Sequence, residues 1–182
     1  MQMFPTIIWQ GRRVSLERPL FVTLINASSD ADLRAFAHEY GGAAPPGVEE
    51  LKALRDDIHL PAVVALRPLS KEQNVKLKDG PEGQTVDYWA ANQLLEQTPI
   101  IGGLAERDGR DQIVFRVADL AGFLAWEVAA AVHVGATTRR CEMCSKLFLF
   151  GPSTGRRSTA QYCRDTCRVA AMRARHAEGG EA

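Results

Sequence analysis

The chain has 182 residues, which is enough for one ordinary domain with a small appended module. Hydrophobic residues make up 46% of it and charged residues 24%, values that are typical of a folded globular protein and exclude a disordered chain. The 22 basic and 22 acidic residues cancel over the whole chain, although they are unevenly distributed along it.

The first residues predict a small group of strands. Residues 6–9 and 13–17 flank a Gly-containing turn and predict a β-hairpin. Residues 20–25 are rich in β-formers, so we expect a further strand that pairs beside this hairpin. The N-terminus lacks the basic start, apolar core and cleavage site of a signal peptide, and we therefore expect a cytoplasmic protein.

Two helices and two less regular segments follow. Capping residues precede a predicted helix over residues 31–40, and acidic residues occupy the first turn of a second predicted helix over 48–60. Residues 61–66 predict a strand or a short buried connector. The polar stretch 68–83 predicts a loop.

The chain then alternates between helix and hairpin. Thr85 caps a predicted helix that ends at Gln97. Residues 104–107 and 111–117 flank an Asp-Gly turn, which favours a β-hairpin. Asp119 caps a long predicted helix over residues 120–134, whose charged residues argue for a buried core helix and against a membrane span.

All four cysteines lie near the C-terminus in two close pairs. Cys141 and Cys144 form a CxxC pair, and Cys163 and Cys167 form a CxxxC pair that eighteen residues separate from the first. Two such pairs, joined by a predicted strand and turn, are typical of one tetrahedral zinc site. The second pair lies at the start of a predicted helix rich in good helix formers, which suggests a treble-clef-like arrangement.

Other roles for the cysteines are less consistent with the sequence. Two disulfides require an oxidising compartment, and a redox CxxC leaves the CxxxC pair without a role. Four protein ligands leave no open position on the metal, so the predicted zinc is structural and not catalytic. His176 lies nine residues beyond Cys167, and we expect it at the surface.

The cysteine region is strongly basic. Residues 139–176 contain nine Lys and Arg residues but two acidic ones, a net charge of +7, whereas residues 1–138 carry −5. Such asymmetry predicts a basic module that meets an anionic partner. On a helix, Arg164, Arg168 and Arg175 would share one stripe. The candidate DNA contacts are Arg156, Arg157, Arg164, Arg168, Arg173 and Arg175.

Two alternatives to DNA contact stay open. Part of the positive charge would compensate a zinc–tetrathiolate site, whose formal charge is −2. An acidic protein would also suit the arginines, because charge alone does not distinguish it from a nucleic acid.

The remainder of the chain carries few catalytic signals. It contains no HExxH, no phosphate-binding GxxxxGK[ST] and no GxSxG motif, so we expect no enzyme activity. An enzyme of unknown type would become the better hypothesis if the structure held a well-formed pocket with convergent polar groups.

Residues 120–175 resemble the CGNR zinc-finger proteins. The resemblance rests on a long helix, Arg139-Arg140-Cys141, a Leu-Phe strand, Arg156-Arg157 before Tyr162-Cys163, and an Arg-rich final helix. Arg168-Val169-Ala170 stands where that family carries Gly-Asn-Arg, so the chain would be a divergent member. The resemblance implies an N-terminal α/β domain of the ABATE type and a role as a DNA-binding transcription regulator.

The sequence thus predicts an α+β protein in two parts. Residues 1–136 form the N-terminal domain, here called the body, residues 137–176 form the cysteine module, and residues 177–182 are a tail. We expect structural zinc on the four cysteines and DNA as the partner. The body would sense a small-molecule effector or mediate assembly, and a homodimer would strengthen DNA binding. The alternative function is a zinc-stabilised module that docks an acidic protein.

Overall fold

A four-stranded sheet in the order β2-β1-β4-β3 lies at one side of the body. The computed structural model describes residues 6–10, 12–42, 44–67, 86–107 and 110–178. Strand β1 (Thr6–Trp9) pairs antiparallel with the short β2 (Arg12–Arg13), and β3 (Ile100–Arg107) pairs antiparallel with β4 (Arg110–Val117). Both predicted hairpins are therefore confirmed, although the first has a shorter second strand.

The two hairpins join through a parallel pairing of their inner strands. In this register Thr6 lies opposite Val114, Ile7 opposite Phe115 and Ile8 opposite Arg116. The pairing brings the first strand next to a strand more than a hundred residues later. It buries Ile7 and Val114, and Trp9 packs at 5.7 Å from the Phe123 ring.

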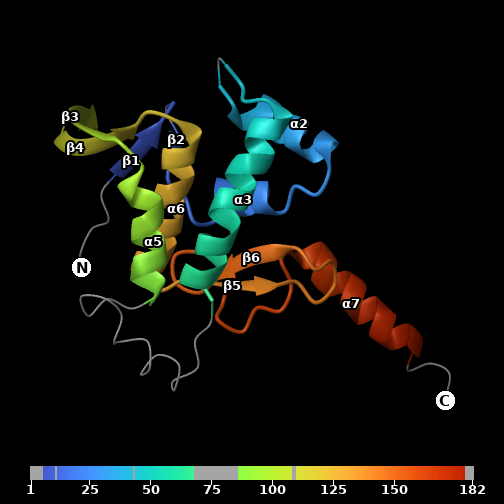
Figure 1. The fold of residues 1–182 in the computed structure, drawn as a ribbon. Helices are drawn as coiled ribbons and strands as arrows, with labels where there is room; N and C mark the ends of the chain where they lie inside the picture. The colour runs from blue at the N-terminus through green and yellow to red at the C-terminus, as the bar shows by residue number, and fades with distance from the viewer. Residues whose placement is uncertain (1–5, 11, 43, 68–85, 108–109, 179–182) are drawn as a thin grey trace.

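The predicted helices with clear capping signals are confirmed (Figure 1). Helix α2 (Asp30–Tyr40) begins with a capping box in which Ser29 and Asp32 bond each other's backbone N–H groups. Helix α6 (Leu120–His133) begins where the Asp119 carboxylate accepts a 2.8 Å hydrogen bond from the Gly122 N–H. Helices α3 (Val48–Ala65) and α5 (Val86–Glu96) also lie where the sequence predicts helices.

The strand expected at residues 20–25 is wrong. The segment is helix α1 (Leu20–Ile25), which follows Pro19 and buries Leu20, Phe21 and Leu24. These three residues lie on one face of a helix, whereas a strand would direct Phe21 away from Leu20 and Leu24. Burial of this face therefore outweighs the β-propensity of the segment.

Helix α3 also differs from the prediction. The sequence indicates an end at residue 60 and a strand or connector over 61–66, but α3 passes through Pro61 and ends at Ala65. Proline removes one helical N–H donor and usually bends or ends a helix. The burial of Ala62, Ala65 and Leu66 in the core holds this last turn in place. The polar stretch 68–83 lies outside the described residues.

Helix α6 occupies the middle of the core. It buries Phe123, Leu124, Val128 and Ala131, and helices α1, α3 and α5 surround it (Figure 1). None of the helices in the described ranges has both the length and the apolar character that a membrane span requires. The described chain is thus a mixed α+β structure organised on one buried helix, as the sequence predicts.

The cysteine module contains the two-stranded sheet of β5 (Thr137–Arg140) and β6 (Leu147–Phe150), followed by α7 (Asp165–Glu178). It packs directly on the body, because Leu149 belongs to the main core and Thr138 bonds the Leu66 carbonyl with both its N–H and its hydroxyl. The division into two domains stays an interpretation of the sequence. Helix α7 points away from the body (Figure 1).

Candidate metal centre and the surrounding arginines

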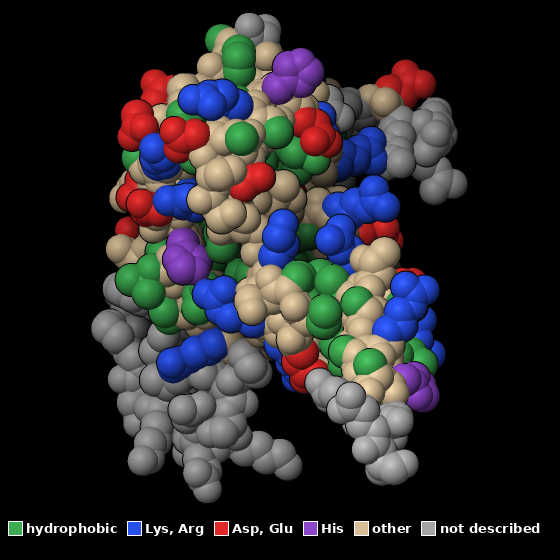
Figure 2. All heavy atoms as spheres, turned by 90° about the vertical axis from the view of Figure 1, so that its right-hand side faces the viewer, with side chains coloured by type: hydrophobic (Ala, Val, Ile, Leu, Met, Phe, Trp, Pro, Cys, Tyr) green, Lys and Arg blue, Asp and Glu red, His purple; other side chains and the backbone are tan. Residues whose placement is uncertain are grey.

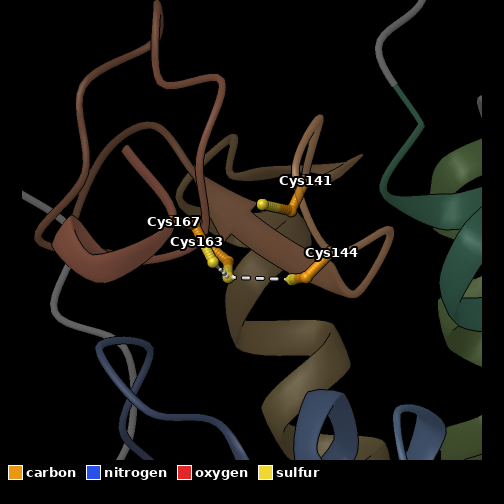
Figure 3. A group of neighbouring side chains, drawn as sticks. All are labelled: Cys141, Cys144, Cys163 and Cys167. Atoms are coloured by element: carbon orange, nitrogen blue, oxygen red, sulfur yellow. Dashed lines mark hydrogen bonds between the residues drawn. The ribbon is translucent and has the colours of Figure 1, made fainter. Parts of the chain in front are cut away.

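Two short segments, each carrying one cysteine pair, bring the four cysteine sulfurs together (Figure 3). Cys141 directly follows β5, Cys144 lies in the turn before β6, Cys163 precedes α7, and Cys167 lies in the first turn of α7. All four Sγ atoms lie within 4.8 Å of one another. Cys141 and Cys167 are buried, whereas Cys144 and Cys163 are half-buried. The set predicted from the two cysteine pairs is therefore assembled in space.

The distances between the sulfurs suit a metal and not disulfides. The Cys163 Sγ lies 3.5 Å from the Cys144 Sγ and 3.6 Å from the Cys167 Sγ, whereas a disulfide bond measures about 2.05 Å. Zn–S bonds of about 2.3 Å in a tetrahedron imply sulfur separations of about 3.8 Å. All four cysteines are free thiols, so the four sulfurs fit a tetrathiolate metal site.

Two backbone hydrogen bonds close the turn between Cys141 and Ser145. The Cys141 N–H donates to the Lys146 carbonyl, and the Ser145 N–H donates to the Cys141 carbonyl, each at 2.9 Å. Ser145 takes the left-handed conformation, with φ at 57°, to close this turn.

Backbone amides stabilise one of the thiolates. Burial opposes ionisation of Cys141, but N–H groups of Cys163, Cys144 and Met143 together outweigh it and lower the pKa of the Cys141 thiol to about 6. Burial is the main cause that raises the pKa of Cys163; hydrogen bonds with the neighbouring thiols raise it further, and the Cys141 thiolate adds charge repulsion in the absence of a cation. The site therefore favours a bound cation that relieves this repulsion.

A small aromatic core supports the cysteines. Phe148 and Phe150 of β6 are buried beside Cys141 and Cys167, and their ring centroids lie 6.3 Å apart. Thr154 in the following loop is also buried, and its hydroxyl donates to the Gly151 carbonyl at 2.8 Å. This loop returns the chain from β6 to the second cysteine pair.

Three of the six arginines predicted to contact DNA interact with other residues of the cysteine module. Arg156 donates to the Cys163 carbonyl at 2.8 Å and lies over the Phe148 ring at 5.8 Å. A hydrogen bond with the Cys167 sulfur is the main cause that raises the pKa of Arg164. Arg175 donates to the Tyr162 hydroxyl at 3.2 Å. The Arg164 contact with a cysteine sulfur agrees with the expectation that part of the positive charge compensates the thiolates.

The other three predicted arginines lie more freely at the surface. Arg168 forms an exposed ion pair with Asp165 at 3.3 Å, a contact that contributes little to stability. Arg157 and Arg173 are exposed, and their side chains form no hydrogen bond or ion pair with any residue of the described ranges. The expected stripe is shorter than predicted, because α7 begins at Asp165 and Arg164 lies just ahead of it.

Sequence reasoning missed two residues of this region. Arg139 donates to the Ala160 carbonyl at 2.8 Å and lies 4.5 Å from the centroid of the Phe150 ring, so it joins β5 to the long loop. Arg18 of the body lines the same recess as several arginines of the cysteine module. The basic composition pointed to Arg139, but no sequence pattern connects Arg18 with residues some 140 positions away.

Sequence and structure comparisons provide no further identification. A search of protein-family models, of curated proteins and of solved structures finds no match to this chain.

Proposed function

We propose that this protein is a DNA-binding transcription regulator whose cysteine module is stabilised by structural zinc. The support for zinc is the set of four free thiols with sulfurs within 4.8 Å of one another. Cys141, Cys144, Cys163 and Cys167 would hold the ion. Since four thiolates fill a tetrahedral site, the ion would supply folding energy and leave no position for a substrate.

The observation that carries the DNA proposal is the exposure of a basic helix that points away from the body (Figure 1). Helix α7 has 14 residues, and Arg168, Arg173 and Arg175 are exposed on it. A helix of this length extends about 21 Å, and a major groove about 12 Å wide admits an α-helix. Arginine also pairs with phosphate through two parallel hydrogen bonds.

The six candidate DNA-contacting arginines would have two different roles. Arg157, Arg168 and Arg173 would make most of the phosphate contacts, because no contact inside the folded module requires Arg157 or Arg173 and only an exposed ion pair holds Arg168. Arg156, Arg164 and Arg175 would hold the module together and add to the local potential. Phosphate contacts would supply affinity, and base contacts would supply specificity.

The test is fluorescence anisotropy of a labelled random duplex titrated with the zinc-loaded protein over a salt series. We expect binding that weakens steeply with salt. In the double variant R157Q/R173Q the log–log slope should fall by up to about two, because each phosphate contact contributes about 0.9 to it. A variant with R34Q and R67Q, two exposed arginines of the body, changes the net charge equally and serves as the control.

If the wild-type protein ignores duplex DNA even at low salt, the DNA proposal fails. An acidic protein partner then becomes the better hypothesis for the exposed arginines. Equal effects of the two double variants would show that total charge, and not the surface of the module, determines binding.

We further propose that the body serves sensing or assembly and that the chain is a divergent CGNR-type protein. One small basic module offers few phosphate contacts, so two copies on one duplex would bind far more tightly than one. Gel filtration with light scattering, with and without DNA, measures the oligomeric state. A strict monomer under both conditions would rule out the dimer.

A further inference from the structure

A recess at the junction of the body and the cysteine module gathers arginines from both parts. It has a volume of about 970 Å³ and lies between residues 17–18 of the body, the loop 154–164 and the start of α7. Figure 2 shows the face of the molecule that lies on the right-hand side of Figure 1, and Lys and Arg side chains gather around its middle. The arginines that line the recess are Arg18, Arg156, Arg157, Arg164 and Arg168.

The charge of the lining favours an anion. Glu17 and Asp165 are the carboxylates among the lining residues, so five arginines leave a net charge of +3. The charge stays positive, at +1, after the formal −2 of a zinc–tetrathiolate site that includes Cys163 of the lining is counted. A smaller adjoining cavity of about 280 Å³ shares Arg18, Arg156 and Arg164 and adds Lys146. The basic surface thus continues from the first turn of α7 across the junction toward β6.

The contacts of the arginines show which of them are available. The Arg156 guanidinium donates to the Cys163 carbonyl, and the Arg168 guanidinium forms an exposed ion pair with Asp165. The guanidinium groups of Arg18 and Arg157 form no hydrogen bond or ion pair with any described residue. The recess therefore combines fixed guanidinium groups with two that can close on a ligand, one from the body and one from the cysteine module.

Phosphate esters match this arrangement better than carboxylates. A carboxylate presents two oxygens on one side and is satisfied by one arginine fork, whereas a phosphate presents oxygens in several directions and accepts from more than one guanidinium. Several converging arginines are the usual means of recognising phosphate in proteins.

We infer that the junction recess is a phosphate-binding site that the body completes through Arg18. The ligand group is a phosphate ester. Under the proposed function, on which this part of the inference rests, it belongs to the DNA backbone. The body is then part of the DNA interface, and the backbone of one strand passes between Arg18 and Arg157.

The test uses the full-length, zinc-loaded protein and the variant R18Q, with R34Q as the matched control. Arg34 is an exposed arginine of α2 that lines neither cavity. Duplex binding is measured by anisotropy across a salt series, and binding of inorganic pyrophosphate is measured by calorimetry. Because Arg18 has no bonded partner among the described residues, we expect R18Q to melt at the same temperature as the wild-type protein.

The inference predicts that R18Q weakens duplex binding at low salt by about three- to tenfold and lowers the log–log slope by about one, whereas R34Q changes neither. If R18Q weakens pyrophosphate binding alone, the recess is a phosphate site, but its ligand is a free phosphate ester and the assignment to the DNA backbone is overturned. If R18Q behaves like R34Q toward both ligands, the phosphate site itself is overturned. In that case duplex binding by the wild-type protein would still support the proposed function.

Discussion

The side-chain amide of Asn26 forms two reciprocal hydrogen bonds with the backbone of Leu147. The Asn26 Nδ2 donates to the Leu147 carbonyl at 2.8 Å, and the Leu147 N–H donates to the Asn26 Oδ1 at 2.7 Å. Asn26 follows α1 in the body and Leu147 opens β6 in the cysteine module, 121 residues later. The Asn26 amide thus pairs with the backbone N–H and carbonyl of Leu147 at the edge of β6, and it fixes how the body and the cysteine module meet.

Removing this amide should loosen the junction. We expect Asn26→Ala to lower the free energy of unfolding by about 1–3 kcal/mol, because the partly buried N–H and carbonyl of Leu147 both lose their partner. Asn26→Asp keeps an oxygen that accepts from the Leu147 N–H, but it leaves the Leu147 carbonyl without a donor. We therefore expect Asn26→Asp to lose less stability than Asn26→Ala. Urea unfolding measures the three proteins. Equal stability of Asn26→Ala and the wild-type protein would contradict this role for Asn26.

Loss of one cysteine should release the metal. We expect Cys144→Ser to weaken zinc binding by more than about 100-fold, since even outer partners of metal ligands typically contribute 10- to 100-fold. Circular dichroism should also show a loss of helix as the start of α7 loses its anchor. Met143→Ala is the matched control, because Met143 is exposed and lies between the first two cysteines. Native mass spectrometry should give one zinc per chain for the wild-type protein and this control.

Glu127 should make stability depend on pH. Its side chain is buried in α6 and accepts a 2.9 Å hydrogen bond from the Phe21 N–H at the start of α1. Burial raises the pKa of Glu127 to about 8, although the N–H groups of Phe21 and Leu20 oppose this shift. The folded state therefore holds the proton more tightly than the unfolded chain, whose glutamate keeps a pKa near 4.5.

Because the pKa of Glu127 is raised on folding, the protein loses stability as the pH rises. The contribution of Glu127 is fully present below pH 4.5 and is lost as the pH rises toward 8. Relative to the wild-type protein, Glu127→Gln should gain stability over this range, by on the order of 4 kcal/mol at pH 8. Urea unfolding of both zinc-loaded proteins between pH 5 and pH 9 measures the difference. A difference that does not change with pH would refute the assignment.

Replacing Pro61 should stabilise α3. Pro61 lies inside the helix, where it provides no N–H donor. We expect Pro61→Ala to raise the free energy of unfolding by about 1–2 kcal/mol, because the gain in helix propensity of up to about 3 kcal/mol exceeds the roughly 1 kcal/mol lost through a more flexible unfolded chain. Thermal melting compares the two proteins. A lower melting temperature for Pro61→Ala would show that packing of the proline ring outweighs the helical gain.

Local sequence signals predicted the parts of the fold that depend on short-range physics. Ser29 and Asp119 mark the starts of α2 and α6 because their side chains cap the nearest free N–H groups. The spacing of the two cysteine pairs predicted that the four sulfurs come together, since each pair lies within one local turn. Residues 20–25 and Pro61 gave wrong predictions because burial against distant helices outweighed local preference in both.

The sequence by itself determined the grouping of the four cysteines, the basic character of the cysteine module and most helices, because composition, spacing and capping act within a few residues. Only the tertiary structure decided which arginines are held inside the module and which stay available. It also placed Asn26 on the edge of β6, Glu127 under the start of α1, and Arg18 beside the arginines of the module. These relationships join segments about a hundred or more residues apart, and they arise from the packing of one shared core around α6.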